Sequence, residues 1–303
     1  MKVGFDRKVN KEGKSGKDKF LIRLAAAMKN LGVEIDNKKP DVYLRLSGSE
    51  PNKKAKVNVL RLDGLWFNTD QKYKNKNKGI KNAIKKSDAL IYQGVFCRDA
   101  YRKFLGVKKD EYKIISNGAD PNEFYERKPE NFFLASCRWR PHKRLKDITK
   151  SFLSALKKGL DSDLIVAGEA NYKVEHERIK YVGWQDINQL KKLLSKAIAS
   201  IHLTWLDWCP NAMVEAIVSG CPIIYSNSGG HTELATDNGI GIKDKAWGFK
   251  ACKLYSPPKI DRKEIANALI EIKNNPIKAN GDYLHIKNIA NKYIDYFEEL
   301  VNK

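Results

Sequence analysis

The chain has 303 residues, of which 42% are hydrophobic and 31% are charged. This length exceeds the roughly 100 to 200 residues of a usual single domain, so two domains are expected. The apolar and aromatic content is enough for packed cores, which excludes an intrinsically disordered chain.

The charge is strongly basic, with 57 Lys and Arg against 36 Asp and Glu and a net charge of +21. Such a field concentrates polyanions, so nucleic acid, anionic membranes and phosphate-bearing small molecules all remain open as partners. The densest run of lysines, at residues 72–86, is typical of a solvated loop and helix face.

The cysteines and the hydropathy pattern indicate the compartment. Five cysteines lie far apart without a Cys-x-x-Cys pair, so neither a zinc cluster nor a compact disulfide framework is predicted. The first residues lack the apolar core of a signal peptide, and no apolar run approaches the length of about 20 residues that spans a membrane. We expect a cytoplasmic protein that contacts an anionic membrane at most peripherally.

In the first part of the chain, short apolar runs alternate with helical stretches, which is typical of parallel strands joined by crossover helices. We expect strands at residues 2–6, 41–46, 57–62, 89–92 and 113–116, and helices at 18–31, near 80 and at 98–105.

A polar segment with two prolines, residues 119–131, then interrupts the pattern and predicts a linker. We place the domains at 1–126 and 127–303, with a last amphipathic helix at 281–301 packing back toward the first domain. The second part is expected to contain strands at 132–136, 163–167, 179–182, 200–203 and 222–225 and helices at 145–158, 188–196 and 211–218.

This order predicts an α/β protein of two doubly wound, Rossmann-like domains with parallel sheets. Ligands of such open sheets bind beyond the carboxyl ends of the strands, so we expect the chemistry in a cleft between the two domains.

The most informative segment is WLDWCPNAMVEAIVSGCPIIYSNSGG, residues 205–230. Asp207 and Glu215 have seven residues between them, and Pro210 lies where a helix should begin. The free amide groups of that first turn suit a phosphate or sugar hydroxyls, and a carboxylate at Glu215 can accept the two vicinal hydroxyls of a ribose. Alone, Glu215 would be an ordinary exposed helix residue.

This segment resembles the signature of glycosyltransferase family 4. In that family two acidic residues flank seven others and are followed by a small residue, Gly, any residue and Pro, and then by a strand that ends in Gly-Gly. Here the second acid is Glu215 and the strand ends at Gly229-Gly230. The first acid is Asp207 where the family usually has Glu, which shortens the side chain by one methylene.

Arg138 and Lys143 follow the strand FFLASC and match the family's Arg with a Lys five residues later. The resemblance implies that these two cations stabilise a diphosphate leaving group, a role that a divalent metal fills elsewhere. Catalytic roles are therefore expected for Arg138, Lys143 and Asp207, and no metal site is expected.

Other matches are less specific. Gly168 in DLIVAGEA and Trp184 in YVGWQ lie where the family lines its nucleotide pocket, and Gly13-Lys14-Ser15-Gly16 resembles its glycine-containing loop. Asp63-Gly64, at the end of another strand, is a candidate for the acceptor side, although a capping Asp in a turn is as good an interpretation. The residues expected to bind the donor are Glu215, Gly16, Pro210, Asn211, Ala212, Gly168 and Trp184.

The resemblance implies the GT-B architecture and a metal-independent, retaining transfer of a hexose-type sugar from a UDP- or GDP-sugar to a glycan, lipid or protein-linked acceptor, without a separate cofactor. A nucleotide-sugar epimerase or a phosphorylase of the same fold is one alternative. A basic nucleic-acid-binding protein and an inactive scaffold are others, although no nucleic-acid recognition module is recognisable in the sequence.

Overall fold

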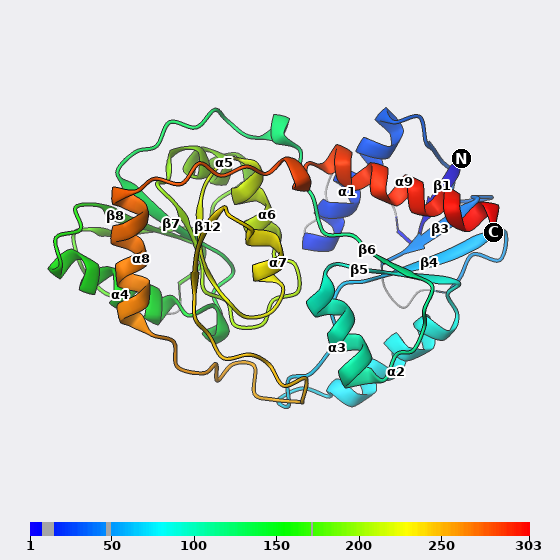
Figure 1. The fold of residues 1–303 in the computed structure, drawn as a ribbon, viewed down its shortest axis with the longest axis horizontal. Coiled ribbons are helices and arrows are strands. Elements are labelled where there is room, and N and C mark those ends of the chain that lie inside the picture. The colour runs from blue at the N-terminus through cyan, green and yellow to red at the C-terminus, as the bar shows by residue number, and fades with distance from the viewer. Residues whose placement is uncertain (8–14, 47–49, 171) are drawn as a thin grey trace. The chain divides into compact units, whose positions relative to one another are not determined.

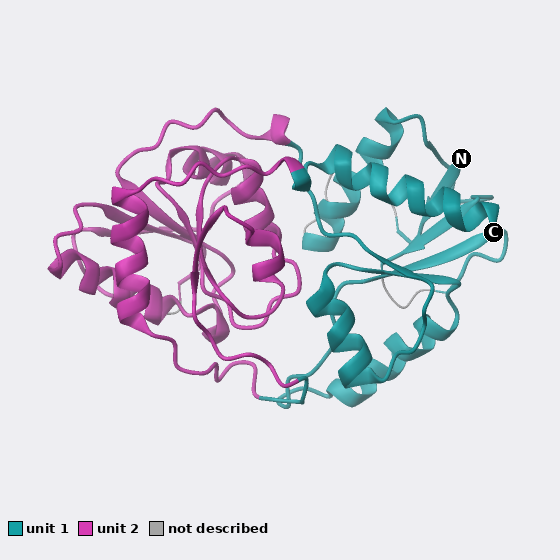
Figure 2. Cartoon of the chain, in the orientation of Figure 1, with its two compact units in different colours: residues 1–120, 249–252, 283–303 teal, residues 121–248, 253–282 magenta. Residues whose placement is uncertain are grey.

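The computed structural model describes residues 1–7, 15–46, 50–170 and 172–303. The chain forms two compact units (Figure 2): unit 1 comprises residues 1–120, 249–252 and 283–303, and unit 2 comprises residues 121–248 and 253–282. In the described residues each unit contains one sheet of six strands, and the strand pairs are parallel. The expected α/β architecture of two Rossmann-like domains is confirmed.

The sheet of unit 1 has the strand order β2-β1-β3-β4-β5-β6. Its strands are β1 (Lys2–Phe5), β2 (Glu34–Ile35), β3 (Val42–Arg45), β4 (Val57–Leu62), β5 (Ala89–Tyr92) and β6 (Tyr112–Ile114). Its helices are α1 (Gly16–Asn30), α2 (Tyr73–Lys85), α3 (Val95–Leu105) and α9 (Ile286–Asn302). The start of α1 is fixed by a capping box, in which Ser15 and Asp18 each accept a hydrogen bond from the other's backbone amide.

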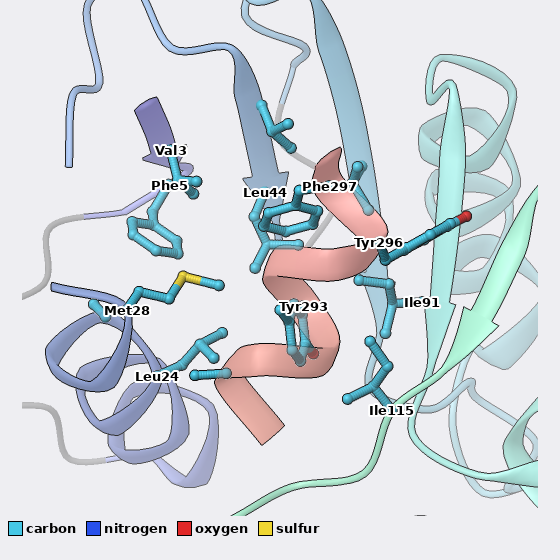
Figure 3. Packing of buried hydrophobic residues seen from close by; sticks show 14 of the residues in the cluster. Val3, Phe5, Leu24, Met28, Leu44, Ile91, Ile115, Tyr293, Tyr296 and Phe297 are labelled. Carbon is cyan, nitrogen blue, oxygen red and sulfur yellow. The ribbon is translucent and has the colours of Figure 1, made fainter. Parts of the chain in front are cut away.

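The core of unit 1 depends on the C-terminal helix α9 (Figure 3). Tyr293 and Phe297 of α9 are fully buried against residues of the sheet and of α1, including Leu24 and Met28. Helix α9 therefore shares one hydrophobic core with β1 and α1.

A buried arginine on β4 joins distant parts of unit 1. Arg61 is 1% exposed; its Nε donates to the hydroxyl of Tyr293 at 2.9 Å, and its guanidinium also bonds Asn117 and forms an ion pair with Asp63. The same group lies 4.1 Å from the ring centre of Phe20 on α1. Because a buried charge is tolerated only when it is well compensated, these contacts fix β4, α1 and α9 together.

The sheet of unit 2 has the order β12-β11-β10-β7-β8-β9. Its strands β12, β7 and β8 are labelled in Figure 1. Its strands are β7 (Phe132–Ser136), β8 (Asp163–Ala167), β9 (Ile179–Gly183), β10 (Ser200–His202), β11 (Ile223–Ser226) and β12 (Gly239–Ile242). Its helices are α4 (Leu145–Lys157), α5 (Ile187–Lys196), α6 (Asn211–Val218), α7 (His231–Ala235) and α8 (Arg262–Asn274), with the 3-10 turn η2 (Pro141–Lys143) before α4. One face is covered by α4 and α8, which lie side by side and bury Phe152 and Leu269.

The strand order of unit 2 reverses next to β7. The chain adds β8 and β9 on one side of β7 and then returns to add β10, β11 and β12 on the other. The carboxyl ends of β7 and β10 therefore adjoin at the topological switch point, which is where open α/β sheets bind their ligands.

The sequence assigns no element to residues 227–280, and α7, β12 and α8 lie there. Helix α8 has buried residues at positions 265, 268, 269 and 272, a helical spacing that the sequence does contain. Strand β12, GIGI, carries little strand signal because of its glycines. A Cβ on Gly239 would lie 1.9 Å from the carbonyl oxygen of Ile223, so close strand packing requires the glycine.

Two bounds differ from expectation. The contacts divide the chain after Asp120 instead of residue 126, since Glu123 pairs with Lys191 of α5 at 3.3 Å and so belongs to unit 2. The last helix begins at Ile286 instead of residue 281. Gly281 lies outside the helix and packs against Val218, where a Cβ on Gly281 would lie 2.6 Å from the Cα of Val218.

The loop that follows β7 is held in place by contacts with the last residues of β8 and with Gly168. Gly168 has φ +98°, and a Cβ there would lie 2.1 Å from the carbonyl oxygen of Cys137, the residue after β7. The indole Nε1 of Trp139 donates to the carbonyl of Ala167 at 2.9 Å, which holds the same loop from the other side.

Gly168→Ala is therefore expected to destabilise the protein by more than the left-handed backbone alone explains, which is about 1–2 kcal/mol. Gly159→Ala is the matched control, because Gly159 has φ +94° with no atom within 4 Å of a built Cβ. Urea denaturation of both variants checks this. Equal losses of unfolding free energy would show that the contact with Cys137 imposes no constraint.

Candidate functional site

Two of the predicted catalytic residues meet at the switch point of unit 2. Lys143 ends η2, which follows β7, and Asp207 follows β10. The Lys143 Nζ lies 2.9 Å from Asp207 Oδ2, and the two side chains are 20% and 24% exposed. Residues 64 positions apart in the sequence thus form a partly buried ion pair at the expected edge of the sheet.

Both members of this pair are charged at neutral pH. Burial would raise the pKa of Asp207, but the Lys143 ammonium outweighs that effect and lowers the pKa to about 2. Burial acts to lower the pKa of Lys143, and the Asp207 carboxylate more than compensates, so that pKa is raised. The carboxylate is also fixed in direction, because Asp207 Oδ1 accepts a hydrogen bond from the Trp208 amide at 2.8 Å.

The Gly229-Gly230 turn packs against the backbone of Asp207 and Trp208. A Cβ on Gly229 would lie 2.5 Å from the carbonyl oxygen of Asp207, and one on Gly230 would lie 2.0 Å from that of Trp208. The amide of Gly230 donates to the Asp207 carbonyl at 2.8 Å. The absence of side chains at this turn lets it pack against the protein's own backbone at the candidate site.

Arg138 lies in the same loop as Lys143, directly after Cys137. Trp139 is buried, whereas Arg138 and Arg140 on either side of it are exposed, so the buried indole directs both arginines outward. Arg140 donates to the hydroxyl of Tyr255 at 3.2 Å. Arg138 is thus placed as a solvent-accessible cation at the carboxyl end of β7.

The predicted donor-binding residues after β10 lie at the start of α6. The helix begins at Asn211, and Pro210 precedes it without a side-chain capping bond. The amides of Met213 and Val214 donate to the carbonyl of Pro210 at 3.0 and 3.1 Å, and the amides of Asn211 and Ala212 precede them in the first turn. Glu215 is in the second turn and partly buried.

Gly168 and Trp184 follow the neighbouring strands β8 and β9, so they share the carboxyl edge of the sheet with Lys143. Gly168 is required by its close approach to Cys137. Trp184 is 71% exposed, which leaves the faces of an indole open to a planar partner.

The remaining predicted residues belong to unit 1. Gly16 is the first residue of α1; Gly13 and Lys14 lie outside the described residues. The Asp63 carboxylate is 3% exposed and engaged by Arg61, by Gln93 at 2.7 Å and by Lys17 at 3.4 Å. The adjacent Gly64 has φ +112° and accepts a hydrogen bond from Tyr101 at 2.6 Å.

Three buried histidines lie around the pair, and none of them has the sequence spacing of a metal-ligand set. Burial lowers the pKa of His142 to about 4, that of His202 to about 3, and that of His231 below its ordinary value. All three are neutral at physiological pH and add no cation beside Lys143. Among the described residues, no group of three His, Cys, Asp or Glu side chains is arranged to hold a metal ion.

In the described parts of the chain, no helix combines the length and the apolar character that crossing a membrane requires.

The ion pair predicts a pH dependence. Because the folded-state pKa of Asp207 lies below its ordinary value of 3.8, the pair stabilises the fold fully above about pH 4 and loses this contribution as the pH falls toward 2. The unfolding free energy of the wild type should therefore fall by on the order of 2 kcal/mol relative to that of Asp207→Asn as the pH falls through that interval. Urea denaturation over a pH series measures it, and a pH-independent difference would contradict the ion pair.

Comparison with known proteins supports the fold. The chain has a TM-score of 0.67 to the sucrose-phosphate synthase of Thermosynechococcus elongatus, at 14% identity, with 100% of this chain and 99% of that chain covered. For HepE of Anabaena in complex with UDP-glucose the TM-score is 0.63, at 15% identity, with 100% and 98% covered. The chain shares the GT-B fold with solved glycosyltransferase structures.

A curated relative is the O-antigen chain mannosyltransferase RfbU of Salmonella typhimurium, which is 24% identical over 184 residues, or 55% of this chain. The match spans about half of the relative, 51% of its length. A family model described as "Glycosyl transferases group 1" matches residues 117–288, which is more than half of the chain and includes all of unit 2. The chain belongs to the glycosyl transferases group 1 family.

Proposed function

We propose that the chain is a cytoplasmic, metal-independent retaining glycosyltransferase of family 4, which moves a hexose-type sugar from a nucleotide diphosphate sugar to a hydroxyl acceptor. The observation that carries the proposal is the Lys143–Asp207 pair at the switch point, because a fixed cation and a fixed carboxylate meet where such sheets bind ligands. Membership in the family supports the same conclusion.

In this proposal the diphosphate binds Lys143 and Arg138. Lys143 has three N–H donors, so it can hold Asp207 and a phosphate oxygen at once. The exposed Arg138 supplies the second charge. Asp207 contacts hydroxyls of the hexose, together with the amides of Asn211 and Ala212 after Pro210.

The nucleoside part is assigned to the neighbouring elements. Glu215 binds the ribose hydroxyls, Gly168 shapes the sheet edge beside the nucleotide through its close approach to Cys137, and the exposed Trp184 offers a stacking surface for the base. On unit 1, the amide of Gly16 is assigned to the donor phosphate and the Asp63-Gly64 turn to the acceptor side.

The chemistry requires mainly electrostatic stabilisation. The bond between the anomeric carbon and the diphosphate oxygen breaks, and negative charge develops on that oxygen, where Lys143 and Arg138 stabilise it. The acceptor hydroxyl attacks the same face of the sugar and gives its proton to the departing phosphate. A dedicated side-chain base is not needed, and the buried His142 would be a weak one because burial lowers its pKa to about 4.

The relatives suggest the class of substrate. HepE is described in complex with UDP-glucose, and RfbU is an O-antigen chain mannosyltransferase. We therefore assign a UDP- or GDP-hexose as the donor and a glycan as the first acceptor class to test, ahead of lipid or protein-linked acceptors.

Turnover tests this assignment. A thermal-shift screen with UDP, GDP and ADP identifies the base, and product analysis with the matching sugars then measures transfer. Arg138→Ala and Lys143→Ala should each lower turnover about tenfold to a thousandfold, as expected for removal of a preorganised charge contact.

Lys157→Ala is the control, since Lys157 is an exposed lysine at the opposite end of α4. Unchanged turnover in both site variants would refute the diphosphate site. Sugar interconversion without an acceptor would indicate an epimerase, and a requirement for inorganic phosphate a phosphorylase. Salt-sensitive binding of nucleic acid without any transfer would favour the nucleic-acid-binding alternative.

We also propose that α2 contacts anionic membranes. The helix has no acidic residue, its lysines Lys74, Lys78 and Lys81 are exposed, and Trp66 beside it is 40% exposed with the Lys76 ammonium 3.6 Å from its ring centre. Exposed lysines with an aromatic side chain are suited to an anionic bilayer surface.

Flotation with phosphatidylglycerol vesicles measures this contact. Changing Lys74, Lys78 and Lys81 to Glu should weaken binding by about a hundredfold or more, since each lysine contributes about 1 kcal/mol at such a surface. The control of equal charge replaces the exposed Lys263, Lys287 and Lys292 by Glu. Equal losses in both triple variants would show a diffuse charge effect and no docking face.

A further inference from the structure

Arg144, the residue after Lys143, carries a buried ion pair. Its Nη1 lies 2.5 Å from Asp244 Oδ2 and its Nη2 lies 3.0 Å from Asp244 Oδ1, and both side chains are 0% exposed. This two-bonded geometry matches the planar guanidinium to the carboxylate and fixes the direction of both.

The same guanidinium bonds two further segments of unit 2. Nη1 donates to the carbonyl of Leu203 at 3.3 Å, and Nη2 donates to the carbonyl of Pro258 at 3.0 Å. Leu203 directly follows β10, the strand that leads to Asp207. One buried side chain therefore connects the exit of β7 to the exit of β10.

Asp244 continues these contacts toward Asp207. The hydroxyl of Ser226 donates to Asp244 Oδ2 at 2.5 Å and lies 2.8 Å from the hydroxyl of Ser228. Because the single proton of Ser226 goes to the carboxylate, Ser228 is the donor in the contact of 2.8 Å, and its alternative acceptor, the Thr204 carbonyl, is farther away at 3.4 Å. Ser228 Oγ in turn accepts the amide of Leu206 at 3.3 Å. A chain of bonds thus runs from the residue after Lys143 to the residue before Asp207.

The backbone at both ends of this chain is in a conformation that L-residues rarely adopt. Arg144 has φ +61° and Leu206 has φ +59°, and they are two of the four described residues other than glycine with positive φ. Such conformations persist only where surrounding contacts impose them, and they occur preferentially at functional sites. Here they flank the two members of the Lys143–Asp207 pair.

We propose that Arg144 is a positioning residue, which with Asp244, Ser226 and Ser228 holds Lys143 and Asp207 in the arrangement that receives the donor diphosphate. The inference rests on the proposed function, because it assigns to these buried groups an effect on diphosphate binding that acts through Lys143. A purely structural role would make Arg144 important for the stability of unit 2 only.

The test is a double-variant cycle read by calorimetric binding of UDP and GDP. Arg144→Lys keeps the positive charge but loses the two-bonded geometry; it is made in wild type and in Lys143→Ala. In wild type it should weaken binding of the preferred nucleotide about tenfold, as expected for residues that act as one network. In Lys143→Ala it should change the dissociation constant less than about twofold, since its route to the diphosphate is already removed.

Arg45→Lys is the matched control. Arg45 is 0% exposed in unit 1 and donates to the carbonyls of Ala83 at 2.9 Å and Lys86 at 3.3 Å. Its replacement should lower the unfolding free energy while leaving nucleotide binding unchanged. If Arg144→Lys does not fold, Ser226→Ala interrupts the same chain of bonds with a smaller change and should show the same pattern in both backgrounds.

The outcomes separate the two proposals. If Lys143→Ala binds UDP and GDP as wild type does, the diphosphate site is refuted and the positioning role falls with it. If Lys143→Ala weakens binding but Arg144→Lys has no effect, or has the same effect in both backgrounds, the positioning role alone is refuted.

Discussion

The position of β7 in the middle of its sheet is the constraint on which the rest of unit 2 depends. Because β7 is the first strand of that unit and its hydrogen-bonded neighbours are β8 and β10, the loops after β7 and β10 leave the sheet next to each other. Lys143 and Asp207 occupy those two loops and form an ion pair there. The parallel strand order brings the two charges together, and local sequence then sets their geometry.

Removing two charges partly from water is unfavourable unless the geometry compensates for it. Here the compensation is specific: Asp207 is held by Lys143 and by the Trp208 amide, and its backbone is supported by Gly229 and Gly230. A site built in this way requires little rearrangement when a ligand arrives, which is the property that electrostatic catalysis uses. The buried Arg61 of unit 1 follows the same rule, because it pairs with Asp63 directly after β4 and bonds Asn117 and Tyr293 of α9.

Much of this arrangement can be predicted from the sequence. The alternation of strands and helices gives the two units, and the spacing of Asp207 from Glu215 and of Arg138 from Lys143 identifies the loops at the switch point. Features that depend on contacts between residues far apart in the sequence are harder to predict. The Arg144–Asp244 pair joins residues 100 positions apart, and no sequence motif predicts that they meet. Similarly, Asp63 is engaged by Gln93, which lies 30 positions away, and by Lys17, and a linear motif does not show either to be its neighbour.

The crystal structure of the chain with its preferred nucleoside diphosphate, UDP or GDP, tests the central claim most directly. The account predicts the diphosphate beside Lys143 and Arg138 at the carboxyl ends of β7 and β10, with the Lys143 ammonium shared between a phosphate oxygen and Asp207. An ordered nucleotide whose diphosphate is held by other residues, away from this edge of the sheet, would contradict it.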